Sequence, residues 1–195
     1  MPLLLLVVPA LLAQATPASP SLDQLQELFK AIPVALVDGK PGAMRGQVAK
    51  AKAAWDQARS KVRKTMPEPE AVFIDRQLKA MQKMKPREQA LGALGLSSTL
   101  SRFQGKSRKQ DRLQAERQIL AAWCGVDGGQ WEPFPNVAEA LKPVLDQDNG
   151  AHTVAVVGAQ DGLKRLQASR QQRQTVAAKQ ALKDLLACVE VIGKS

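Results

Sequence analysis

The sequence predicts an all-α protein, an antiparallel bundle of about six to eight helices in a single domain. Ala, Leu, Lys, Arg and Gln dominate the composition, and these residues lose little freedom on entering a helix. Aromatic residues make up only 4%, Tyr is absent, and strand-forming residues gather only at 154–157. Behind a short leader, about 180 residues remain, which is enough to bury a core without disulfides.

The chain begins with an apolar stretch over residues 3–12, followed by the small-residue triplet Ala-Gln-Ala at 13–15. This order is typical of a secretory signal peptide, although no Lys or Arg precedes the apolar stretch. Ten helical residues cover about 15 Å, half of the roughly 30 Å hydrocarbon core, so the stretch is too short to span a membrane. We therefore expect a signal peptide over 1–15, a short disordered leader over 16–20, the bundle over 21–195, and export to the periplasm or beyond the cell.

Residues 44–62 carry the clearest helical periodicity. Their apolar residues recur at alternating steps of four and three: Met44, Val48, Ala51, Trp55, Ala58 and Val62. Such spacing predicts a helix that turns one apolar stripe toward antiparallel neighbours. The prolines in residues 66–69 predict its end, because each removes a backbone donor and disfavours helix at the preceding residue.

Two further helices follow this break. The apolar side of the first is Phe73, Ile74, Leu78 and Met81. Pro86 predicts the start of the second, because proline is favoured in the first helical turn, and Gly105 predicts its end. The apolar residues of this second helix are Leu91, Leu94, Leu96, Leu100 and Phe103.

The spacing of Ser107 and Gln110 predicts a capping box that opens the next helix, which we expect to end at Gly125. Its apolar face is Leu113, Ile119, Leu120, Trp123 and Cys124. A loop rich in Gly and Pro follows, and we expect Trp131 and Phe134 to fold back over the end of the bundle. A binding lip is the alternative for these two aromatic residues.

A further helix is predicted to begin with a cap formed by Asn136 and Glu139 and to be kinked or shortened by Pro143. Residues 146–150 are predicted to form the next turn, and the remainder of the chain to be helical to Ile192. Residues 153–162 are compatible with either helix or a turn.

Cys124 and Cys188 are the two cysteines of the chain. An even pair in an exported protein predicts a disulfide, because the compartment is oxidising. Such a bridge would join the last helix to the helix that follows Ser107 and stabilise the fold by roughly 4 kcal/mol in the chain-entropy model. The alternative is two buried free thiols.

Positive charge is concentrated in residues 40–112, which hold 18 Lys or Arg against six Asp or Glu in a chain of net charge +10. The basic face predicted here comprises Lys50, Lys52, Arg59, Lys61, Arg63 and Lys64. Export argues against nucleic acid as the partner and favours anionic lipid head groups, lipopolysaccharide, other envelope polymers or acidic client proteins. The alternative is a solvated face that keeps the protein soluble. No segment after residue 15 is apolar enough to span a membrane.

The alternative function is a periplasmic metal- or haem-binding bundle, because helical bundles often hold cofactors between facing helices. The candidate ligands are His152 with Asp148, and Met81 with Met84 one helical turn apart. One His with loop carboxylates falls short of the three or four ligands that a divalent metal usually takes, and the CxxCH haem motif is absent. No cofactor is therefore predicted.

The single His has no Ser or Cys nucleophile motif beside it, and the carboxylates are scattered over helix faces predicted to be exposed to solvent. A carboxylate pair assembled from distant positions is the enzymatic alternative. The sequence favours a non-enzymatic exported protein that binds anionic envelope partners or client proteins, or that has a structural role.

Overall fold

The computed structural model describes residues 19–131, 135–148 and 150–193. Within these ranges it contains eight helices and no strand, which confirms the all-α prediction. In chain order they are α1 (Leu22–Val37), α2 (Pro41–Val62), α3 (Glu68–Met81), α4 (Pro86–Ser101), α5 (Arg108–Asp127), α6 (Pro135–Asp146), α7 (Thr153–Gln171) and α8 (Thr175–Ile192). The predicted signal peptide over 1–15 and most of the predicted leader over 16–20 lie outside the described residues.

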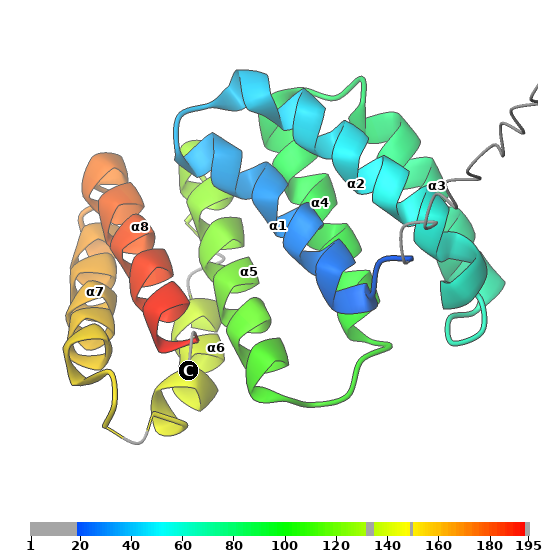
Figure 1. Cartoon of the computed structure of the whole chain (residues 1–195). Helices are drawn as coiled ribbons and strands as arrows, with labels where there is room; N and C mark the ends of the chain where they lie inside the picture. Colours follow the sequence, from blue (N-terminus) through cyan, green and yellow to red (C-terminus); the bar gives the residue numbers. More distant parts are fainter. Residues whose placement is uncertain (1–18, 132–134, 149, 194–195) are drawn as a thin grey trace, which may run out of the picture.

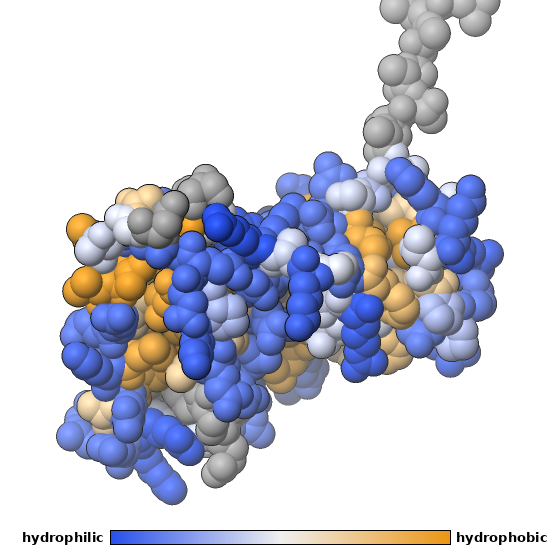
Figure 2. All heavy atoms as spheres, turned by 90° about the horizontal axis from the view of Figure 1, so that it is seen from below, coloured by the Kyte–Doolittle hydropathy of each residue, from blue (hydrophilic) through white to orange (hydrophobic). Residues whose placement is uncertain are grey.

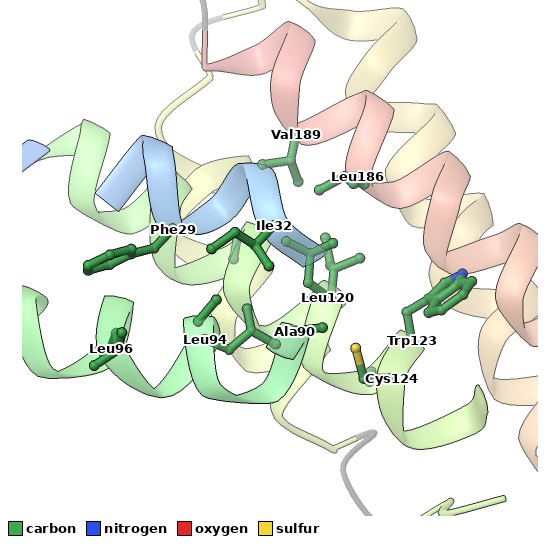
Figure 3. Close-up of a cluster of buried hydrophobic side chains, with 14 of the residues drawn as sticks. Phe29, Ile32, Ala90, Leu94, Leu96, Leu120, Trp123, Cys124, Leu186 and Val189 are labelled. Carbon is green, nitrogen blue, oxygen red and sulfur yellow. The ribbon is translucent and has the colours of Figure 1, made fainter. Parts of the chain in front are cut away.

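α5 lies at the centre of the arrangement (Figure 1). On one side α1 packs against α2 and α4, and α3 contacts α2 and α4; on the other side α8 packs against α5 and α7, while α6 packs against α5. Figure 3 shows the core continuing across α5, from Phe29 of α1 and Leu94 of α4, past Leu120, to Leu186 and Val189 of α8. One continuous core makes the eight helices a single domain.

α2 confirms the predicted apolar stripe, because all six residues of the stripe are buried. Trp55 is fully buried at its middle, and its indole Nε1 donates a hydrogen bond to Asp75 Oδ1 of α3 at 2.6 Å. The stripe therefore fixes which side of α2 faces the core. The Lys and Arg residues between the stripe positions are left on the outer side.

Two residues predicted to face the core are exposed instead: Phe73 at 45% and Leu91 at 42%. The fully buried residues of α3 include Ile74 and, one helical turn on, Leu78. Phe73 is one residue, or about 100°, away from this row and lies beside it. α4 also ends at Ser101, before the predicted stop.

α5 begins as predicted after Ser107, whose hydroxyl accepts a hydrogen bond from the backbone N–H of Gln110 at 3.2 Å. This is one half of the predicted capping box, and the Gln110 side chain donates to Asp23 Oδ1 at 3.3 Å. The predicted end at Gly125 is wrong, since the helix continues to Asp127. Gly125 is buried within the helix, and a glycine there costs only about 1 kcal/mol relative to Ala, which packing in the core offsets.

In α6, Asn136 and Glu139 lie inside the helix and do not form its N-terminal cap. Pro143 also lies inside the helix, close to its end at Asp146. Trp131 is half-buried and packs against the core, as predicted for the loop before α6. Phe134, predicted to do the same, lies outside the described residues.

Residues 153–162, for which the sequence allowed either helix or a turn, are helical and form the first half of α7. The predicted continuous helix to Ile192 is wrong, because the chain breaks at residues 172–174 between α7 and α8. Arg173 there has a φ of 52°, in the left-handed region that ends a helix. The break lets α8 run back beside α7 (Figure 1).

Candidate functional site

The six residues of the predicted basic face all lie on α2 or just after it. Three of them form ion pairs: Lys52 with Asp56 at 2.5 Å, Arg59 with Asp75 at 2.6 Å and Arg63 with Glu68 at 2.7 Å. Lys50, Lys61 and Lys64 are exposed, and none has an acidic partner in the part of the chain that the structure describes. Half of the predicted face is therefore neutralised locally.

Exposed cations without an ion pair continue from α2 onto α3 and the loop before α4. Among the described residues we group these cations with the three free lysines of the basic face and call them the cationic surface: Lys40, Arg45, Lys50, Lys61, Lys64, Arg76, Lys79, Lys83 and Lys85. Three of the four acids of α2 and α3, namely Asp56, Glu68 and Asp75, already pair with cations outside this surface, so most of its positive charge is not cancelled by an ion pair. It creates a field that attracts anions from a distance.

The helices on the other side of α5 offer a different surface. Figure 2 shows apolar residues gathered over the region of α7 and α8, and a second apolar area on the other side of the bundle. Val154 near the start of α7 is 88% exposed, and Val157 and Val191 are also exposed. The cationic surface and this apolar one thus lie on opposite parts of the bundle.

The structure does not bring the four candidate metal ligands together. His152 Nδ1 lies 3.0 Å from Asp148 Oδ1, and the same oxygen accepts the backbone N–H of His152 at 3.2 Å, so this pair holds the turn before α7. Met81 is fully buried at the end of α3, and Met84 packs beside the core. α3 and the start of α7 lie at opposite ends of the molecule (Figure 1). No group of three His, Cys, Asp or Glu suited to a metal occurs among the described residues.

The predicted disulfide is not formed, because Cys124 and Cys188 are both free thiols. α5 and α8 do pack against each other, but the two cysteines face different neighbours. A Cβ placed on Gly158 would lie 3.1 Å from Cys188 Sγ, so this thiol lies against α7. In Figure 3, Trp123 points toward α8, whereas Cys124 points into the buried cluster near Ala90 and Leu120. The prediction was wrong about the side of α8 on which Cys188 lies.

We expect Cys188 to react with a thiol reagent before Cys124. Burial raises the pKa of Cys124 to about 11, and the nearby charge of Asp127 adds to that rise. Burial also raises the pKa of Cys188, but this thiol is only half-buried. Because the thiolate is the reactive form and needs access to the reagent, iodoacetamide should label Cys188 first. Peptide mass mapping over time tests this, and equal labelling rates would contradict the packing described for Cys124.

An ion-pair cluster between α1 and α5 escaped the sequence interpretation. Glu116 is fully buried, and its Oε2 lies 2.9 Å from Lys30 Nζ. Lys30 also pairs with Glu27 at 2.9 Å, and Arg112 reaches Glu27 at 2.6 Å. We call these four residues the Glu116 cluster. The sequence does carry a sign of this cluster. Glu116 is three residues from both Leu113 and Ile119, which places a charged residue within the apolar face of its helix.

Burial is the largest influence on Glu116 and raises the pKa of its carboxyl, against the opposing charge of Lys30. For Lys30, burial lowers the pKa, but the charges and hydrogen bonds of Glu116 and Glu27 together outweigh it, and the pKa is raised. A pocket of about 540 Å³ opens beside the cluster and is lined by acids and cations alike, among them Glu27, Arg112 and Asp148. Most of its charged residues already pair with one another or with neighbours, and only Arg108 forms no ion pair among the described residues, so the walls offer little net charge to a ligand.

In comparisons with known proteins, no family model matches the chain, and neither does any curated protein or solved structure. Among the described residues, no helix combines the length and the apolar character needed to cross a membrane. Function is therefore inferred from the chemistry of the surfaces.

Proposed function

We propose that this protein is an exported, non-enzymatic helical-bundle protein that binds an anionic component of the cell envelope through its cationic surface. The observation that supports the proposal is the accumulation of exposed, unpaired cations on α2, α3 and the loop before α4. The apolar stretch at residues 3–12 and the Ala-Gln-Ala triplet after it support export.

Like charges held close together repel one another, and an anionic partner removes that repulsion. Within α2 the apolar stripe is buried, so the cations lie on a rigid helix and not on a mobile tail. A rigid array loses less conformational freedom when it binds a charged surface or polymer. These properties favour binding over a role limited to solubility.

We expect the protein to bind vesicles that contain an anionic lipid and to lose that binding as salt screens the charges. Each basic residue near an anionic surface contributes about 1 kcal/mol, so reversing Lys50, Lys61 and Lys64 to Glu should weaken affinity at least about tenfold. The matched control reverses Lys142, Lys164 and Lys183 to Glu. These three lysines are exposed, lie on α6 to α8 and change the net charge equally. Co-sedimentation with phosphatidylglycerol vesicles at low and raised salt measures both variants.

Three results would contradict the proposal: no binding at low salt, binding that salt does not weaken, or equal losses in the two triple variants. Equal losses would mean that net charge matters and the surface does not. The intact mass of the protein from its native host checks export. If residues 1–15 were retained there, nucleic acid would return as a candidate partner.

A further inference from the structure

A pocket of about 460 Å³ opens within the cationic surface, where the start of α2 meets the end of α3 and the start of α4. Three cations line it, Arg45, Lys83 and Lys85, and none of the residues that line it is acidic. None of the three forms an ion pair with any residue that the structure describes. The pocket beside the Glu116 cluster differs in this respect, because acids already hold most of its cations.

We propose that this pocket, which we call the anion pocket, binds a phosphate group, in particular the doubly charged group of a phosphomonoester. The inference rests on the proposed function and names the chemical group that the cationic surface recognises. Three cations around one concavity carry more positive charge than a single negative charge neutralises, so the pocket favours an anion with two charges. A guanidinium donates two parallel hydrogen bonds to phosphate oxygens, and the two ammonium groups add compact charge.

Two hydrogen bonds hold the backbone that forms the walls of the anion pocket. Gln89 is 2% exposed, and its Nε2 donates a hydrogen bond to the carbonyl oxygen of Met81 at 2.8 Å. This bond ties the end of α3 to the first turns of α4. The backbone N–H of Met84 donates to the same carbonyl at 3.2 Å, which holds the loop that carries Lys83 and Lys85. A preformed pocket pays less ordering entropy on binding.

The start of α2 completes the pocket on its third side. No side chain caps this helix, and its first turn carries no acid. A Cβ placed on Gly42 would meet nothing within 4 Å, so the backbone there is open to a ligand. The positive end of the helix dipole adds to the attraction of the three cations, which carry the inference.

The first test titrates inorganic phosphate into the full chain and follows heat by calorimetry. Replacing Arg45, Lys83 and Lys85 by Gln should weaken phosphate binding at least about tenfold, since the variant loses the charge-assisted hydrogen bonds to the phosphate oxygens. The control replaces Lys142, Lys164 and Lys183 by Gln and should leave the affinity within about twofold. Far-UV circular dichroism and thermal melting establish that both variants are folded.

A second arm asks whether the phosphate belongs to a lipid. Vesicles of phosphatidic acid carry a phosphomonoester, and vesicles of phosphatidylglycerol at matched surface charge carry a phosphodiester. We expect tighter binding to phosphatidic acid, and we expect the Arg45, Lys83 and Lys85 variant to lose this preference. Phosphate binding without a preference between the vesicles would support the pocket with free phosphate as its ligand.

Failure of the two proposals can be told apart. No phosphate binding, or equal weakening in the pocket variant and its control, would overturn the anion pocket, whatever the vesicles show. Salt-sensitive binding to phosphatidylglycerol vesicles in that case would still support the proposed function. Phosphate binding without any vesicle binding would overturn a lipid as the envelope partner and leave the pocket standing.

Discussion

Replacing Lys30 by Met is expected to lower the free energy of unfolding by about 3 kcal/mol near neutral pH, because it leaves a buried carboxylate without its partner. Glu116 is fully buried, and Lys30 is its nearest cation, at 2.9 Å. After the change, only Arg112 remains near, with Nε at 3.7 Å from Glu116 Oε1. Urea denaturation followed by circular dichroism measures the loss.

The loss should depend on pH in a defined direction. Burial raises the pKa of Glu116 above its ordinary value of 4.5, and Lys30 opposes that rise. Without Lys30 the folded pKa rises further, so the folded variant holds a proton that the unfolded chain releases. A raised folded pKa makes stability fall as pH rises from the unfolded value toward the folded one. The difference from the unmodified protein should therefore be largest at neutral pH and shrink below about pH 4.5.

The double variant Lys30→Met with Glu116→Leu is the control. Replacing both members of a buried pair by apolar residues is often neutral or stabilising, so we expect the double variant to recover part of the stability lost in Lys30→Met. If the double variant were no more stable than Lys30→Met, the buried charge of Glu116 would not be the cause of the loss.

The fold was predictable where a local pattern determines the face of a helix. The stripe of α2 repeats at heptad spacing from Met44 to Val62, and all six positions are buried. The pattern fails at single positions, such as Phe73, because one residue turns a side chain by about 100° around the helix. The same angular error misplaced Cys188, which lies against α7.

The candidate site was predictable in its charge but not in its geometry. Arg59 and Lys61 look alike in the sequence, yet Arg59 meets Asp75 of the next helix at 2.6 Å while Lys61 stays exposed. Likewise Glu116 was visible as a charge within an apolar face, but its partner Lys30 lies 86 positions earlier in the chain. Pairing of this kind depends on which helices meet, and local periodicity carries no information about that.

The substitution Trp55→Ala is expected to lower the free energy of unfolding by about 3–5 kcal/mol, because it empties the centre of the α2 stripe. Trp55 is fully buried, and its Nε1 also donates to Asp75 Oδ1 at 2.6 Å. Trp55→Phe keeps most of the apolar volume and removes the hydrogen bond. Asp75 keeps its ion pair with Arg59, so this variant should lose only about 1–2 kcal/mol. Urea denaturation compares the two variants. A loss in Trp55→Ala no larger than that in Trp55→Phe would mean that the hydrogen bond, and not the packing of the indole, holds α2 in the orientation that leaves its cations outside.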